Sequence, residues 1–165
     1  MKFMIILGID PGTVRIGYAL LDKKENAVVN LMTYGCLEIK SKAQTERLAE
    51  ISRLVSYLIS KYHPKTLAIE KLFFTKNAKT ALAVAEARGV VINAAASLGL
   101  NVLEFTPLQV KAAVTGYGKA PKKQIQEMVC RLLNLKEIPR PDDAADAIAI
   151  GLTACYTNPK LLTQI

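Results

Sequence analysis

Two short apolar segments of this 165-residue chain each end in an acidic residue, and this feature constrains the fold most. The segment MIILGID ends at Asp10, and the segment TLAIE ends at Glu70. Short apolar runs of this kind are typical of strands buried on both faces of an α/β sheet. A charge that ends such a strand has to lie at the edge of the sheet, where the sites of open α/β sheets assemble.

The remaining pattern predicts one α/β domain. Residues 4–10, 16–22 and about 28–39 read as strands with short links, which favours an antiparallel meander. Residues 42–62 predict an amphipathic helix, because apolar residues recur there at steps of three and four. Further elements are expected as follows: strands at 66–70 and 101–105, an alanine-rich helix at 78–97, and helices starting near Pro107, Pro121 and Asp142.

Strands followed by alternating helices and strands predict a five-stranded mixed sheet, with its first three strands antiparallel and helices on both faces. We expect a single domain over residues 1–165, with a flexible tail over about the last eight residues. The alanine-rich helix is expected to pack closely, either internally or against a second copy of the chain.

The charge balance favours an anionic partner. Lys and Arg number 22 against 14 Asp and Glu, so the net charge is +8. This charge favours nucleic acid as a partner, and the alternative is a basic protein whose charge has no specific role. No apolar run reaches the roughly 20 residues that span a bilayer, and the start carries no cleavage site, so a cytoplasmic protein without a membrane partner is expected. The three cysteines are far apart and are expected to be reduced.

A third acidic group stands in the segment PDDAADAIAIGL. Asp143 and Asp146 are three residues apart and therefore share a helical face, and Ala144, Ile148, Leu152 and Cys155 form the neighbouring apolar stripe. Asp142 is the best candidate for the helix cap, although its spacing from Asp146 also permits a role as a ligand.

Each acid also has a purely structural interpretation. Asp10 before Pro11 and Gly12 is a common turn starter, and Glu70 could end its strand in solvent or pair with Lys71. Asp143 and Asp146 could only compensate the helix dipole. Four converging carboxylates, however, would repel one another unless a cation joined them, and their hard oxygen atoms suit Mg²⁺ or Mn²⁺. Two such ions could hydrolyse a phosphodiester without a histidine or a covalent nucleophile.

Three segments in this order and spacing carry a family resemblance: GIDPGTVRIGYAL, AIEKLFFTKNAKTALAVAEARGV and DDAADAIAIGL. The chain resembles the RuvC family of bacterial Holliday junction resolvases along nearly its whole length. The resemblance implies an RNase H-like fold, a homodimer, Mg²⁺-dependent nicking of four-way junction DNA, and RuvA and RuvB as branch-migration partners. It maps the catalytic, metal-binding quartet onto Asp10, Glu70, Asp143 and Asp146, and thus selects Asp143 over Asp142.

Aromatic and basic residues supply candidate DNA contacts. Phe73 and Phe74 follow Glu70, where they could stack on unpaired bases or fill the core, and the resemblance puts Phe73 at the crossover point of the junction. By the same resemblance, Lys111 and Lys122 match basic residues required for activity. Charge and position alone add the following candidate phosphate contacts, for which ordinary solvated side chains are the alternative: Lys76, Lys79, Lys119 and Lys123. No role is assigned to Arg88.

Other function classes remain open from sequence alone. A YqgF-type nuclease, which acts on ribosomal RNA precursor, begins with a similar motif, but the FFTKNAK loop argues against it. The actin and sugar-kinase superfamily begins with a related acidic turn, but it requires a second comparable domain. A basic junction-binding module without enzymatic activity would use its acids only as caps.

Overall fold

The first strand lies at the centre of a five-stranded sheet. The computed structural model describes residues 4–72 and 78–157. Its strands are β1 (Met4–Asp10), β2 (Arg15–Lys23), β3 (Val29–Glu38), β4 (Thr66–Glu70) and β5 (Asn101–Phe105), in the order β3-β2-β1-β4-β5. β1, β2 and β3 are antiparallel neighbours, whereas β4 and β5 run parallel to β1. The predicted mixed sheet with an antiparallel first half is confirmed.

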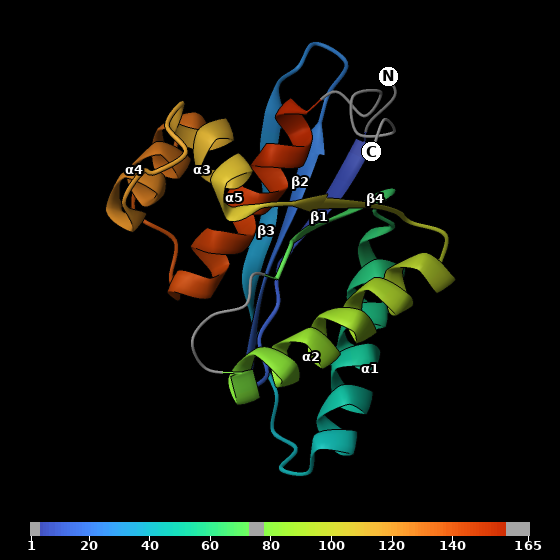
Figure 1. Ribbon diagram of the computed structural model, residues 1–165. Coiled ribbons are helices and arrows are strands. Elements are labelled where there is room, and N and C mark those ends of the chain that lie inside the picture. Colours follow the sequence, from blue (N-terminus) through green and yellow to red (C-terminus); the bar gives the residue numbers. More distant parts are fainter. Residues whose placement is uncertain (1–3, 73–77, 158–165) are drawn as a thin grey trace.

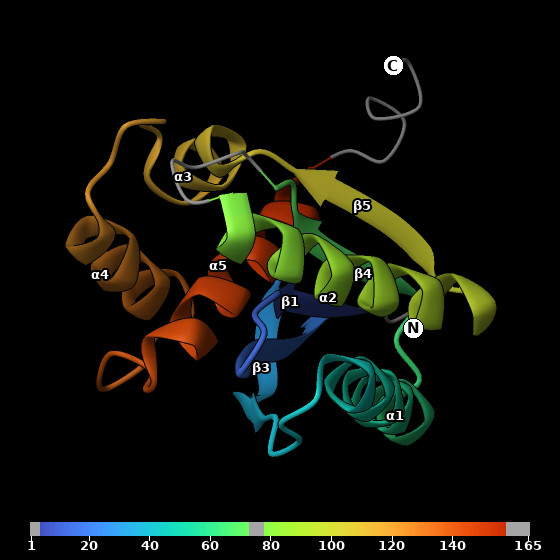
Figure 2. The same ribbon diagram turned by 60° about the horizontal axis from the view of Figure 1, so that its bottom comes forward.

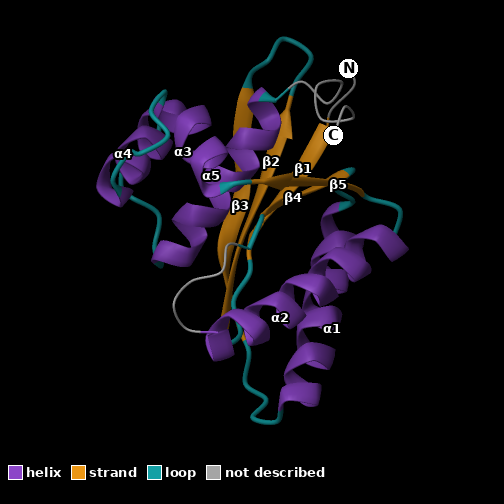
Figure 3. Cartoon of the chain, in the orientation of Figure 1, coloured by secondary structure: helices purple, strands orange, loops and turns teal. Residues whose placement is uncertain are grey.

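Helices cover both faces of this sheet (Figures 1 and 2). One face packs against α1 (Gln44–Tyr62) and α2 (Ala78–Ser97), and the other packs against α3 (Pro107–Thr115), α4 (Lys122–Leu132) and α5 (Asp142–Tyr156). Because side chains alternate along a strand, neighbours such as Ile6 and Leu7 on β1 enter different cores. Figure 3 shows the sheet as the layer between the two groups of helices.

The two helices on the first face follow the sequence pattern. Ile51, Val55 and Leu58 of α1 are buried as the helical spacing predicts. Ala87, Ala94 and Ala95 of α2 are buried in the same core, so much of the alanine-rich surface packs inside the chain. None of the helices in residues 4–72 and 78–157 is long and apolar enough to cross a membrane.

Helix α5 is more buried than its sequence pattern predicts. A single apolar stripe was expected, but every residue from Ala147 to Cys155 is buried. The reason is that α3 and α4 cover the outer side of α5, through residues such as Val110 and Val129, while its inner side lies on β1 and β2. α5 is therefore a central helix rather than a surface helix.

Three glycines let α5 lie directly on the strand backbones. A Cβ atom at Gly8 of β1 would overlap the carbonyl oxygen of Ala147 and lie 2.8 Å from the amide nitrogen of Gly151. A Cβ at Gly17 of β2 would overlap the carbonyl oxygen of Asp143. These close approaches fix both the depth and the position of α5 relative to the sheet.

We predict that Gly8→Ala lowers the free energy of unfolding by about 3 kcal/mol, because backbone atoms of α5 cannot yield to the added methyl group without a shift of the helix. Urea unfolding followed by circular dichroism measures the change. Gly89→Ala in α2 is the matched control, since its Cβ would meet nothing within 4 Å. Helix propensity predicts that this control gains about 0.5–1 kcal/mol. Equal effects of the two substitutions would contradict the close packing of α5.

Candidate functional site

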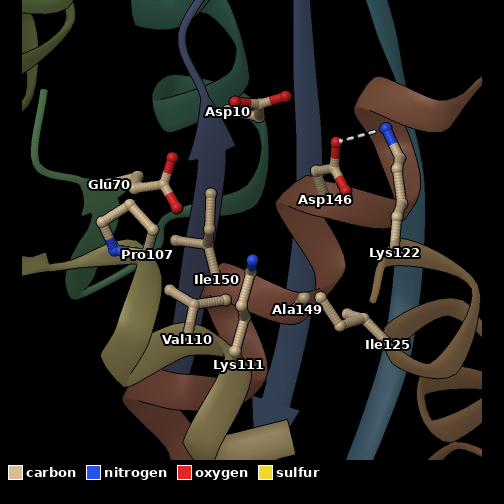
Figure 4. A pocket seen from close by; sticks show the side chains of 10 residues that line it. All are labelled: Asp10, Glu70, Pro107, Val110, Lys111, Lys122, Ile125, Asp146, Ala149 and Ile150. Atoms are coloured by element: carbon tan, nitrogen blue, oxygen red, sulfur yellow. Dashed lines mark hydrogen bonds and ion pairs between the residues drawn. The ribbon is translucent and has the colours of Figure 1, made fainter. Parts of the chain in front are cut away.

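A pocket of about 240 Å³ opens where β1 and β4 end. Three acidic side chains from three separate parts of the chain face it, together with two lysines (Figure 4). The lining residues are Asp10, Glu70, Pro107, Val110, Lys111, Lys122, Ile125, Asp146, Ala149 and Ile150.

Strand pairing brings the first two acids together. β1 and β4 are adjacent and parallel, and their pairing runs to Ile9 opposite Ile69. Asp10 and Glu70, the next and last residue on each strand, therefore lie at the same edge of the sheet. The sequence prediction of a shared edge for these two carboxylates is confirmed by this register.

The first turns of α5 bring the third acid to the same edge. Asp146 faces the pocket, whereas Asp143 is not among the lining side chains. Asp143 nevertheless lies close enough for its charge to raise the pKa of Asp10. The close contact between the Asp143 backbone and Gly17 holds this end of α5 on β2, beside the end of β1.

Burial and mutual repulsion raise the pKa values of these carboxylates. Burial raises the pKa of Asp10 to about 7, and the charges of Asp146, Glu70 and Asp143 contribute in that order. Burial, followed by the charge of Asp146, also raises the pKa of Glu70. The pKa of Asp146 is raised by burial although Lys122 opposes the shift. A bound cation would relieve this repulsion directly.

Lys122 at the start of α4 is a basic partner of Asp146. Its Nζ donates a hydrogen bond of 3.1 Å to Asp146 Oδ2 and lies 3.4 Å from Asp142 Oδ2 (Figure 4). Lys122 also lowers the pKa of Asp10. The ammonium group thus partly neutralises one side of the acidic pocket.

The prediction that Asp142 caps α5 is wrong. Pro141 occupies the cap position, and no side chain makes a cap hydrogen bond there. Asp142 instead contacts Lys122, Arg140 (3.7 Å) and Gln126 (3.3 Å). The cause is that α4 and Arg140 present donors beside Asp142, which sequence spacing along α5 cannot reveal.

The acidic pocket suits a hard cation, although its carboxylates are not gathered around one point. Its charged lining consists of carboxylates and lysines, and carboxylate oxygen atoms are the ligands that Mg²⁺ and Mn²⁺ prefer. Within the described part of the chain, no three His, Cys, Asp or Glu side chains are grouped closely enough to hold an ion as they stand. Binding would therefore require the carboxylates to draw together and Asp146 to exchange its lysine partner for the ion.

The predicted basic residues divide into two groups. Lys111 and Lys122 line the pocket, and Figure 4 shows Lys111 pointing from α3 toward the space between Glu70 and Asp146. Lys119 and Lys123 are exposed and do not line it. Their predicted phosphate contacts remain predictions. Phe73, Phe74 and Lys76 lie outside the described residues, as does the side chain of Lys79 on α2.

The histidine and the cysteines of the chain do not line the pocket. His63 ends α1, just before the start of β4, and so lies at the opposite end of β4 from Glu70. The three cysteines are free thiols, as expected. Sequence analysis missed Arg88, whose side chain binds the backbone of Glu70. The sequence signal for it was its place in the family segment AIEKLFFTKNAKTALAVAEARGV, from which no role for this arginine was assigned.

Comparison with known proteins identifies the family. The family model of the crossover junction endodeoxyribonuclease RuvC matches residues 6–154. This chain belongs to the RuvC family. A RuvC from Halothermothrix orenii is 49% identical over 162 residues, covering 98% of this chain and 96% of that protein. A RuvC from Moorella thermoacetica is 50% identical over 156 residues, covering 94% and 92%.

The fold also matches a solved RuvC structure. Thermus thermophilus RuvC, determined in complex with a Holliday junction substrate, superposes with a TM-score of 0.86 at 35% identity. The match covers 93% of this chain and 94% of that chain. The RNase H-like fold expected from the RuvC resemblance is thereby confirmed, and the chain is a crossover junction endodeoxyribonuclease.

The raised pKa of Asp10 predicts that its ionised form destabilises the metal-free protein. The pKa is about 7 in the fold and about 3.8 in an unfolded chain, so the folded state binds the proton more tightly. This contribution to stability is complete below pH 3.8 and is lost as the pH rises through about 7. With chelator at about pH 8, Asp10→Asn should therefore raise the free energy of unfolding by roughly 2–4 kcal/mol.

Urea unfolding at about pH 5 and pH 8 measures this difference, which should be smaller at the lower pH because Asp10 remains protonated there. Glu127→Gln, an exposed carboxylate on α4, is the control and should show no comparable change. A stabilisation by Asp10→Asn that is independent of pH would argue against the raised pKa.

Proposed function

We propose that this endonuclease resolves four-way DNA junctions by metal-dependent hydrolysis, with Asp10, Glu70, Asp143 and Asp146 as its metal ligands. The products would be paired, symmetric nicks with 5′-phosphate and 3′-hydroxyl ends, as the RuvC family resemblance implies. The observation that carries the proposal is the single pocket into which Asp10, Glu70 and Asp146 point. The junction in the complex of Thermus thermophilus RuvC supports the choice of substrate.

The cofactor would be Mg²⁺, with two ions in each site and Mn²⁺ as a substitute. When bound, such ions supply charge stabilisation for the scissile phosphate and lower the pKa of a water molecule. The carboxylates would hold the ions, and the chain itself adds two ammonium groups at the pocket, Lys111 and Lys122. These lysines are suited to hold the DNA phosphates against the acidic edge, where the backbone would otherwise be repelled.

Lys122 would have two partners during one cycle. Lys122 makes an ion pair with Asp146. If the Asp146 carboxylate held an ion, the ammonium group of Lys122 would be free to contact a phosphate. In this way the lysine limits repulsion among the acids before loading and contributes to DNA binding afterwards.

The partners and surroundings of the enzyme also belong to this proposal. A homodimer with a two-fold axis would present two identical sites to two strands of like polarity, which the paired nicks require. Phe73 would stack on bases at the crossover point, and RuvA and RuvB would supply branch migration, all by family resemblance. The enzyme would act in the cytoplasm as a single-domain subunit.

The main test offers the protein a four-way junction, a linear duplex, an RNA–DNA hybrid and a structured RNA, each with Mg²⁺, Mn²⁺, Ca²⁺ or chelator. We expect cutting of the junction alone, with Mg²⁺ or Mn²⁺. Asp10→Asn, Glu70→Gln and Asp146→Asn should each lower the rate at least about 100-fold, because one lost carboxylate removes a shared ligand.

Junction binding by these variants in Ca²⁺ should remain within about threefold of the wild type, since loss of one carboxylate also reduces repulsion of the phosphates. Glu127→Gln is the matched control for both readouts. Cutting of the hybrid or the RNA without the junction would refute the proposal in favour of a YqgF-type activity. Cleavage by Asp10→Asn at the wild-type rate would support the alternative that the acidic residues have only a structural role.

The dual role of Lys122 predicts opposite effects on metal binding and on cleavage. Lys122→Gln should tighten Mn²⁺ binding to the DNA-free protein by about threefold, because Asp146 no longer has a competing ammonium. The same variant should cut junctions at least about tenfold more slowly. Electron paramagnetic resonance of free Mn²⁺ and a cleavage assay measure the two effects. Lys123→Gln, the exposed neighbour outside the pocket, is the control, and unchanged or weaker Mn²⁺ binding by Lys122→Gln would contradict the competition.

A further inference from the structure

Arg88 connects three elements behind the acidic pocket. It lies on α2, and its side chain is only 16% exposed. Its Nε donates a hydrogen bond of 2.8 Å to the backbone carbonyl oxygen of Glu70, at the end of β4. Its Nη2 donates to the carboxylate of Glu104 on β5, which also makes an ion pair with Arg88. One planar guanidinium thus joins α2, β4 and β5.

The bond to Glu70 forms where the sheet supports the chain on one side only, through the pairing of Glu70 with Phe105 of β5. The pairing of β4 with β1 ends at Ile69, so the ladder on that side does not extend to Glu70. On the other side, the amide of Lys71 donates to the carbonyl of Phe105 at 2.7 Å. Arg88 and this last backbone bond therefore hold the strand end from which the Glu70 side chain enters the pocket.

Arg88 acts on the backbone rather than on the carboxylate. It does not line the pocket, whose cations are Lys111 and Lys122. The charges that shift the pKa of Glu70 are those of Asp146 and Lys111, after burial, and Arg88 is not among them. Its ion pair with Glu104 fixes the guanidinium plane, and a fixed plane directs Nε toward the Glu70 carbonyl.

We propose that Arg88 is a positioning residue for catalysis, which holds the end of β4 so that the Glu70 carboxylate reaches the metal-binding edge. The inference rests on the proposed function of Glu70. Groups that orient ligands in this indirect way typically change metal affinity or activity by 10–100-fold when removed. Substrate binding should be spared, because Arg88 lies outside the pocket.

The test compares Arg88→Gln, Arg88→Lys and Glu104→Gln with the wild type, and uses Arg53→Gln on the exposed face of α1 as the control. We expect Arg88→Gln to weaken Mn²⁺ binding to the DNA-free protein about tenfold and to slow single-turnover cleavage about 10–100-fold. Junction affinity in Ca²⁺ should stay within about twofold. Arg88→Lys should recover part of the loss, because it keeps a donor but not the planar fork. Glu104→Gln, which keeps a neutral acceptor for the guanidinium, should show a smaller loss of the same kind.

A local readout separates positioning from general stability. Hydrogen exchange of the Lys71 amide, which follows Glu70 directly, should accelerate in Arg88→Gln more than exchange in the buried strand β1. If Arg88→Gln lowers only the free energy of unfolding, with Mn²⁺ binding and single-turnover rate unchanged, the proposal is wrong. If Arg88→Gln does not fold, wild-type behaviour of both Arg88→Lys and Glu104→Gln would overturn it equally. A wild type that binds Mn²⁺ but cuts no junction would instead count against the proposed function, while the Mn²⁺ and exchange measurements still decide the role of Arg88.

Discussion

The contact between α5 and the backbones of β1 and β2 is the constraint on which the rest of the molecule depends. Gly8, Gly17 and Gly151 remove the side chains that would keep the helix away from the sheet. The lack of side chains at these three positions sets the position of the Asp146 carboxylate relative to Asp10 at the end of β1. It also leaves α5 deep enough for α3 and α4 to cover it, and those two helices carry the pocket lysines. The packing of α5 on the sheet therefore brings both the carboxylates and the lysines to the same pocket.

Much of this architecture is predictable from sequence because it depends on local patterns. Strands at Met4–Asp10, Thr66–Glu70 and Asn101–Phe105 agree with their apolar runs, and the short links correctly predict the antiparallel meander. The acids at the two strand ends meet as expected, since parallel neighbouring strands end together. Periodicity and turn residues suffice for these features because each depends on a few adjacent residues.

The features that sequence did not reveal all depend on contacts between distant segments. Burial around the whole of α5 follows from the placement of α3 and α4, which no pattern within α5 encodes. Asp142 contacts Lys122 rather than capping its helix, because α4 happens to lie beside it. Arg88 reads as an ordinary helix residue until the fold brings it to the carbonyl of Glu70. The family resemblance could name the carboxylates, but only the fold reveals what holds them in place.

The order of the acids along the chain has a consequence for the cell that makes this nuclease. Asp10 and Glu70 belong to the first half of the sequence, whereas Asp143 and Asp146 stand on the last helix of the described chain. During synthesis the site is thus incomplete until α5 has left the ribosome and settled on β1 and β2. Under the ligand set proposed above, a nascent polypeptide without α5 would carry only two of the four carboxylates. Under this proposal, nuclease activity would begin only once α5 has been synthesised and has packed on the sheet.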